Sequence, residues 1–157
     1  MASVLLALAV VFTGLYAGMM LIFLTGIMPA MARLTDGQFV TAMRRLNEEV
    51  PRGLFLLVFL AEVAFPVAAL AVPVDDRSDT QLWLLVAGLI CVVLNHVVTV
   101  AGNIPLNNAL ASSEASPETH PDTAVREAFE SRWNRFHAVR TLLAVAGFAL
   151  IVSASLS

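Results

Sequence analysis

The sequence contains no lysine and little charge of either sign. Charged residues make up only 13% of the 157 residues, whereas soluble domains have about 25%. Hydrophobic residues make up 59% of the chain. A water-soluble fold of this size cannot hide so much apolar surface, so the expected solvent and partner is the lipid bilayer. The net charge of −3 gives no basic footprint for nucleic acid, and we expect no such partner.

Cysteine is almost absent as well. The single Cys91 lies in an apolar run, which excludes an internal disulfide and a cysteine-rich metal site. A cleaved signal peptide is also unexpected, although residues 29–32 resemble a cleavage site. No basic residue precedes Val4, and the uncharged run up to Ala32 is longer than a signal core. We expect this segment to be a retained helix.

Long hydrophobic runs are what the chain has instead. They cover residues 4–30, 53–74, 82–103 and 136–156, and each reaches the roughly 20 residues that a helix needs to cross the hydrocarbon core. The runs are continuous rather than alternating, which favours helices over barrel strands. The sequence therefore predicts an all-α fold, an integral-membrane four-helix bundle, as a single transmembrane domain over residues 1–157.

The connections between these runs differ in arginine content. The first and third connections hold most of the basic residues: Arg33, Arg44, Arg45, Arg52, Arg126, Arg132 and Arg135. The positive-inside rule places both connections in the cytoplasm and both termini outside, in a multi-pass protein of the cell membrane.

Within the first connection, residues 36–50 carry Phe39, Met43, Leu46 and Val50 at helical spacing. This pattern predicts a short amphipathic helix on the membrane surface or under the bundle. Residues 112–122 are expected to form a flexible loop that contains a solvated His120. A short helix capped by Thr123 is expected to begin at Ala124 and to run into the fourth hydrophobic run, and residues 73–80 are expected to form an acidic turn.

The second hydrophobic run contains an acid. Glu62 lies near its middle, where an ionisable group indicates a functional site. Pro66 follows four residues later and removes the usual hydrogen-bond donor to the Glu62 carbonyl. Two interpretations remain open: a structural pair with Arg140 or a histidine, and a proton-handling or ligand-binding role.

The third run ends in polar residues. His96, Asn103 and Asn107 share one face if the helix continues past Pro105, which is expected to kink or end it. Asn95 points elsewhere on this spacing. The stripe predicts either hydrogen bonding between helices or a polar pocket.

The fourth run begins with the densest polar motif. Trp133, His137 and Arg140 share one face, and Asn134 lies on the adjacent stripe. An interfacial anchor explains Trp133 alone, but Arg140 lies about two turns inside the run and needs a partner or a role. If the third and fourth runs are neighbours, these groups form a pocket open to the cytoplasmic leaflet, with Glu62 at its floor.

Two further features leave alternatives open. His96, His137 and Glu62 could supply the two-histidine, one-carboxylate set of a non-haem metal site, although no local ligand motif supports it, and we expect no cofactor. Gly14 and Gly18 form a small-residue motif that suits either packing within the chain or a homo-oligomer.

These features together resemble the anthrone oxygenase-like family of small membrane proteins. The resemblance rests on four helices in about 150 residues, the segment Asn103-Ile104-Pro105-Leu106-Asn107-Asn108, and Trp133-Asn134-x-x-His137-x-x-Arg140. It implies oxidation of an anthrone to an anthraquinone by molecular oxygen without an obligatory organic cofactor. Asn103, Asn107, Trp133, Asn134, His137 and Arg140 are the family-type positions; Glu62 and His96 come from the residues alone.

We therefore expect an oxygenase or oxidoreductase, cofactor-independent or metal-assisted, acting on a lipophilic aromatic, anthrone- or quinol-like molecule. His137 or His96 would act as the base, Arg140 with Asn103 or Asn107 would stabilise the oxyanion, and Trp133 would stack on the ring. The alternatives are a non-enzymatic accessory subunit, a module that binds lipid or a small molecule, and a proton path or transporter using Glu62 and His96.

Overall fold

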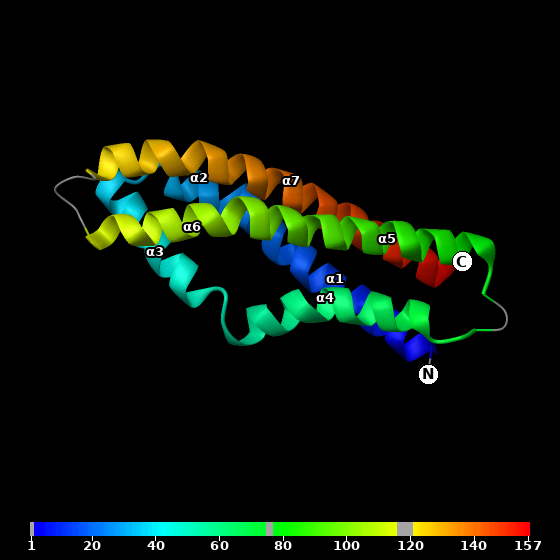
Figure 1. The fold of residues 1–157 in the computed structure, drawn as a ribbon. Coiled ribbons are helices and arrows are strands. Elements are labelled where there is room, and N and C mark those ends of the chain that lie inside the picture. The colour runs from blue at the N-terminus through cyan, green and yellow to red at the C-terminus, as the bar shows by residue number, and fades with distance from the viewer. Residues whose placement is uncertain (1, 75–76, 116–120) are drawn as a thin grey trace.

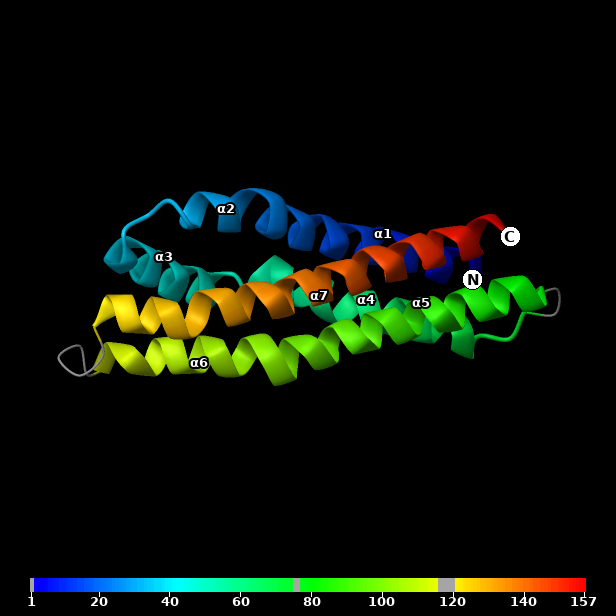
Figure 2. The ribbon, with the colours of Figure 1, turned by 90° about the horizontal axis from the view of Figure 1, so that it is seen from above.

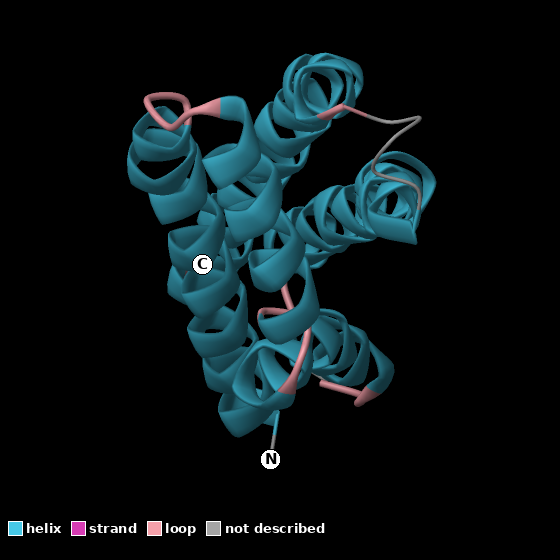
Figure 3. Ribbon diagram, turned by 90° about the vertical axis from the view of Figure 1, so that its left-hand side faces the viewer, coloured by secondary structure: helices cyan, strands magenta, loops and turns pink. Residues whose placement is uncertain are grey.

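The structure, a computed structural model, describes residues 2–74, 77–115 and 121–157. Helices account for most of these residues, and no strand occurs among them (Figure 3). Four helices are long and apolar enough to cross a membrane: Ser3–Met31, Gly53–Ala71, Asp79–Ala115 and Asp122–Leu156. The predicted all-α bundle with four spanning helices is confirmed, whereas the sidedness of its connections stays a prediction.

The four long helices run along one common axis (Figures 1 and 2). The first comprises α1 (Ala2–Ile22), the π-helical turn η1 (Phe23–Ile27) and α2 (Met28–Met31). The third comprises α5 (Asp79–Val98), the π-helical turn η2 (Thr99–Asn103) and α6 (Ile104–Ser112), and the fourth is α7 (Asp122–Leu156). Both termini lie at the same end of the bundle, as an even number of crossings requires (Figure 1).

The two remaining helices share the length of the bundle between them. The second spanning helix, α4 (Gly53–Ala71), lies along the half nearer the termini, and α3 (Asp36–Glu49) lies along the other half (Figures 1 and 2). A capping box between Thr35 and Gln38 starts α3. Its buried residues include Phe39 and Met43, which confirms the predicted amphipathic helix.

The third spanning helix is longer than the sequence predicted. It was expected to end near residue 103, but it continues through Pro105 to Ser112. The physical reason is η2, in which the Ile104 N–H bonds to the Thr99 carbonyl five residues back. Pro105 follows this wider turn in the first turn of α6, a position at which proline needs no N–H. The turn η1 precedes Pro29 in the same way.

The fourth spanning helix is one helix of 35 residues that begins at Asp122. The expected short helix therefore runs into the fourth span as predicted, and it begins two residues before Ala124. Thr123 does not cap it, because the Thr123 hydroxyl donates to the Asp36 carboxylate of α3 at 2.9 Å. The expected loop is shortened by α6 and the 3-10 turn η3 (Ser113–Ala115). Residues 116–120 of this loop, including His120, lie outside the described residues, as do Asp75 and Asp76.

The molecule has two halves that differ in their surfaces. Large exposed apolar side chains occur on α1, α4, α5 and the later part of α7, and end at Ile104 and Phe136. At 1.5 Å per residue α7 is about 50 Å long, and therefore exceeds the roughly 30 Å of the hydrocarbon core. We call α1, α4, α5 and residues 136–156 the membrane half. We call α2, α3, α6 and residues 122–135 the head.

Close helix packing uses glycines in the membrane half. A Cβ on Gly88 of α5 would lie 2.7 Å from Cγ1 of Ile151 in α7, so these helices approach as closely as glycine allows. A Cβ on Gly14 would lie 2.9 Å from the Phe148 ring, which shows packing within the chain. Gly18 has no atom within 4 Å of such a Cβ, and a homo-oligomer at this motif stays a prediction.

Candidate functional site

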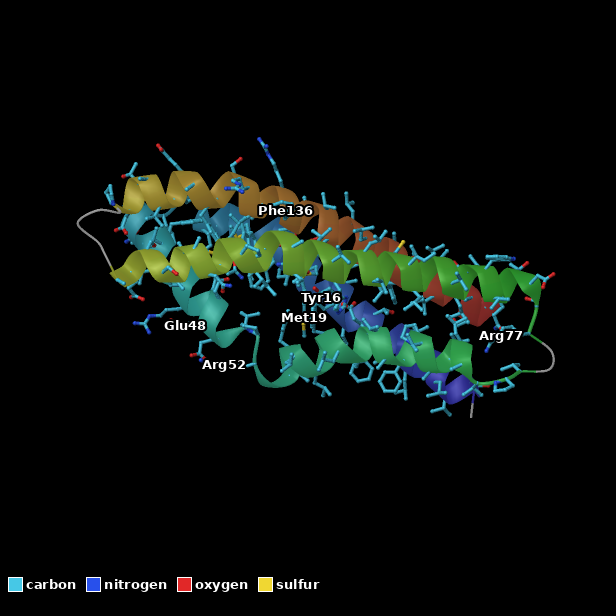
Figure 4. The ribbon with its side chains drawn as sticks, viewed as in Figure 1. Tyr16, Met19, Glu48, Arg52, Arg77 and Phe136 are labelled. Carbon is cyan, nitrogen blue, oxygen red and sulfur yellow. The ribbon has the colours of Figure 1, made fainter. Side chains whose placement is uncertain are left out.

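A buried polar core crosses the centre of the membrane half. Each of the four spanning helices contributes to it, and its members are Thr13, Tyr16, Glu62, Asn95, Thr99, His137, Arg140 and Thr141. Tyr16 projects from α1 near the middle of the bundle (Figure 4). Polar groups removed from water and lipid need partners from neighbouring helices. The candidate site is therefore expected where these polar groups lack a partner.

Glu62 is paired with Asn95. The Asn95 amide nitrogen donates to the Glu62 carboxylate at 3.1 Å, and Glu62 is only 1% exposed. Asn95 was expected to point away from the polar groups, but it is the direct partner of the acid. His96 also lies close, with Nδ1 at 3.5 Å from the same carboxylate oxygen. The histidine alternative for the Glu62 pair therefore has geometric support, whereas Arg140 forms no ion pair with it.

The His96 ring belongs to this side of the core. Its Nδ1 lies 2.9 Å from the Val92 carbonyl oxygen, and its Nε2 lies 3.0 Å from the Phe59 carbonyl oxygen. The ring also stacks on Phe59 at 4.0 Å between centroids. These contacts hold His96 beside Glu62, so its position suits a structural partner of the acid better than a base.

His137 and Arg140 form a second pair, within α7. The Arg140 Nε donates to His137 Nδ1 at 3.0 Å, and His137 Nε2 lies 3.2 Å from the Met20 carbonyl oxygen of α1. Because Nδ1 accepts a hydrogen bond, Nε2 carries the ring proton and donates it to that carbonyl. The lone pair that a general base needs is therefore occupied, and the geometry makes His137 the residue that orients Arg140.

The Arg140 guanidinium lies beside aromatic and hydroxyl groups. Arg140 is 8% exposed, and its guanidinium carbon lies 5.4 Å from the centre of the Trp133 ring. Its Nη1 has a long contact of 3.5 Å to the Thr99 hydroxyl. No carboxylate forms an ion pair with it within the described ranges. The cation is buried, oriented and without a counter-charge.

A cavity of about 230 Å³ lies at the junction of the membrane half and the head. Arg140 is the only ionisable side chain among its lining residues, which are Met20, Phe23, Leu46, Asn47, Val50, Pro51, Phe55, Leu56, Phe59, Thr99, Asn103, Ile104, Asn107, Trp133 and Arg140. The two π-helical turns contribute Phe23, Thr99 and Asn103 to its wall. Such turns are frequent at functional sites because they change the direction of side chains within a helix.

The cavity wall contains a short hydrogen-bonded chain. The Asn103 amide nitrogen donates to the Trp133 carbonyl oxygen at 3.2 Å, and the Trp133 indole N–H donates to Asn107 Oδ1 at 2.8 Å. Trp133 also stacks on His137 at 4.8 Å between ring centroids. Asn103 Oδ1 is buried and has no partner in the described structure. It is thus an acceptor available to a bound molecule.

The sequence-predicted residues separate into two groups. Asn103, Asn107, Trp133 and Arg140 line the cavity together. Glu62, His96 and His137 lie behind its wall, so Glu62 does not form the floor that was expected, and Asn134 lies in a polar surface hollow beside Arg126 and Glu130. No three metal-ligating side chains cluster anywhere in the described chain, so His96, His137 and Glu62 do not form the metal site considered as an alternative.

Two residues of this region were missed in the sequence. Tyr16 lies in an apolar run that gives no sign of a polar role, but its hydroxyl is enclosed without a partner among described atoms, and Asn95 and Thr99 lie near it. Asn47 of α3 lines the cavity, and its amide nitrogen is also enclosed without a partner. The sequence signal for Asn47 is weak: it lies on the same face as Met43 and Val50 of the amphipathic helix, which is buried.

Comparisons with known proteins place these residues in a family context. The sequence model of the family described as anthrone oxygenase matches residues 39–150. The match runs from α3 into the last turns of α7, and it includes the cavity residues Asn47, Asn103, Trp133 and Arg140 but not the α1 residues. No curated protein and no solved structure matches the chain.

Proposed function

The chain belongs to the anthrone oxygenase family, and we propose that it is a membrane-embedded oxygenase. It oxidises a lipophilic aromatic molecule, of the anthrone or quinol type, with molecular oxygen. The observation that carries this proposal is the buried Arg140 guanidinium, held by His137 at the wall of an aromatic cavity without a carboxylate partner.

A buried cation without a counter-charge favours an anionic ligand. Removing a guanidinium from water is costly, and an oxygen anion bound in the cavity offsets part of that cost. Because the surroundings are largely apolar, the attraction between Arg140 and such an anion is stronger than in water. A site of this kind stabilises an enolate or phenolate oxygen.

The remaining walls suit a flat, apolar molecule. Four aromatic side chains line the cavity, namely Phe23, Phe55, Phe59 and Trp133. Aromatic rings favour offset stacking on other rings, and an apolar pocket with a few polar groups is typical of sites for small molecules. The cavity also lies where the exposed apolar surface ends, near Ile104, so a lipophilic molecule can reach it from the bilayer.

The reaction requires little acid–base machinery from the protein. An anthrone loses a proton from its ring methylene, and the negative charge moves to the carbonyl oxygen, next to the Arg140 guanidinium. The resulting carbanion reduces O2, and a carbon–oxygen bond forms at the former methylene carbon. Loss of water from this peroxide leaves a ketone, so one oxygen atom enters the product and the other leaves as water with the two methylene hydrogens.

Each polar residue then has a separate task. Arg140 stabilises the enolate oxygen, and His137 orients Arg140 by accepting the Arg140 Nε–H bond at Nδ1. Asn103 Oδ1 accepts a hydrogen bond from a ligand hydroxyl. The methylene proton passes to water, because the cavity lining contains no carboxylate and no imidazole. The protein accelerates the reaction by making the carbon acid easier to ionise.

Oxygen uptake tests this proposal. Purified protein in detergent or lipid discs is mixed with 1,8-dihydroxy-9-anthrone, and the initial rate of oxygen consumption is compared with that of protein-free discs. We expect a faster rate with protein, and a loss of roughly 100- to 1,000-fold in the protein-dependent rate for Arg140→Leu, as for the removal of an oxyanion donor.

The matched control is Arg135→Leu, an exposed arginine on the same helix, which should retain the wild-type rate. Anthraquinone formation is followed by its absorbance, to verify one product per O2 consumed. Equal rates with and without protein on anthrones and hydroquinones would refute the oxidation and leave ligand binding without turnover.

A further inference from the structure

We propose that Asn47 is a ligand-binding residue whose amide N–H donates a hydrogen bond to an acceptor oxygen of the bound molecule. The proposal rests on the proposed function only in taking the cavity as the ligand site. It adds a contact from α3, a helix of the head, to the contacts from the spanning helices. The bound molecule therefore needs an acceptor oxygen on the side that faces α3.

The first observation is the state of the Asn47 side chain. It lines the cavity, and its amide nitrogen has no hydrogen-bond partner although it is enclosed. Buried amide groups are nearly always paired, so each exception needs an explanation. A ligand acceptor in the adjoining cavity supplies the missing partner.

The second observation is the arrangement of unpaired groups around the same cavity. Asn103 presents a free acceptor at Oδ1, whereas Arg140 presents a guanidinium without a carboxylate. Asn47 adds a donor from a different helix. Three polar groups from α3, η2 and α7 thus surround one apolar space, a pattern that fixes the orientation of a small molecule.

The third observation is the connection that carries Asn47. Val50 and Pro51, just after α3, line the cavity, and α4 begins at Gly53, whose φ of +48° suits glycine. Phe55 and Phe59 of α4 line the cavity beyond this turn. Asn47 and two aromatic rings of α4 therefore line one cavity, where a planar ligand can stack on a ring and present an oxygen to the amide.

Intrinsic fluorescence measures binding without any need for turnover. The chain contains 2 tryptophans. Trp133 lines the cavity, and Trp83 is 68% exposed near the start of α5. In a Trp83→Phe background the emission comes from Trp133 alone. Its quenching is titrated with anthracene, which has no oxygen, and with 9,10-anthraquinone, which has two acceptor oxygens and no donor.

We expect Asn47→Leu to weaken 9,10-anthraquinone binding roughly three- to tenfold, the range for one neutral hydrogen bond, and to leave anthracene binding unchanged. Asn108→Leu is the matched control, because Asn108 of α6 is exposed and does not line the cavity. That variant should bind both probes as the wild type does.

Three outcomes of the quenching experiment would overturn the proposal. An equal loss for both probes means that Asn47 only shapes the wall, and no loss for either means that it makes no contact. Failure of both probes to quench Trp133 in the wild-type background removes the ligand site itself. Quenching with the expected pattern but without oxygen uptake supports the Asn47 contact and refutes the oxidation instead.

Asn47→Asp keeps the side-chain shape and provides a second test, should Asn47→Leu fail to fold. It removes the donor, so it too should weaken anthraquinone binding selectively. Unchanged or tighter anthraquinone binding by Asn47→Asp would contradict the proposal.

Discussion

The interiors of the two halves of the molecule differ in how many polar side chains they bury. The membrane half buries polar groups such as Glu62, Asn95 and Arg140, while leucines and valines cover its surface. The head buries an apolar cluster that includes Met43, Leu110 and Phe129, and charged side chains cover its surface. Lipid provides no hydrophobic driving force for helix association, so polar contacts and close packing stabilise the membrane half. In the head, burial of apolar side chains away from water provides that driving force.

The difference explains where the site lies. Trp133 belongs to the apolar cluster of the head, and its ring also stacks on His137 of the polar core. The cavity opens where these two kinds of interior meet. Arg140 lies at this junction, buried within the bundle and next to the cavity.

The largest effect on stability should follow from breaking the polar pairing of the membrane half. Asn95→Leu leaves the Glu62 carboxyl without its amide donor, and we expect a loss of about 1–3 kcal/mol in the free energy of unfolding. Thermal unfolding in detergent measures this loss. The double variant Glu62→Leu with Asn95→Leu should recover most of it, because no unpaired polar group remains. A double variant as unstable as Asn95→Leu would refute the pairing.

A smaller effect is expected for the polar network on the head. Arg126 donates to Asp36, Glu130 and the Leu34 carbonyl, and its guanidinium lies 4.6 Å from the Phe39 ring centre. Arg126→Met should cost about 1–2 kcal/mol. In contrast to the buried pair, this loss should shrink as salt is added, because water and ions reach the head. A salt-independent loss would mean that the network is shielded like the membrane half.

The smallest effect is expected for an exposed ion pair at the turn between α3 and α4. Arg52, which Figure 4 labels at this turn, donates to Glu49 at 3.1 Å, with side chains 64% and 71% exposed. Arg52→Ala should change the free energy of unfolding by less than about 0.5 kcal/mol. The same unfolding measurement applies, and a change as large as that of Arg126→Met would show that the turn contributes to stability.

The sequence predicted the spans and the cavity residues of two helices. Hydropathy located all four spans, because each apolar run is long and continuous. Asn103, Trp133 and Arg140 were identified because such residues are costly within an apolar run. Their common cavity agrees with the prediction that the third and fourth spans are neighbours.

The features that the sequence did not predict depend on contacts between helices, which local sequence patterns do not specify. Regular helical spacing placed Asn95 away from the polar groups, since it could not include the wide turn η2. Tyr16 reads as an ordinary apolar residue because Asn95 and Thr99, which lie near it, come from another helix. A base role for His137 stays a prediction, and the sequence could not show the contact of its ring with the Met20 carbonyl, because Met20 belongs to α1.

The wide turn at residues 99–103 also sets how α6 is rotated about the helix axis relative to α5. A π-helical turn holds one residue more than the α-helical turn it replaces. Deleting a single residue there would restore regular α-helical winding and rotate the side chains of α6 by about 100° about the helix axis. Asn107 would then leave the cavity while Asn95 kept its place beside Glu62. The one additional residue of this turn thus aligns the polar side chains of α6 with those of α5.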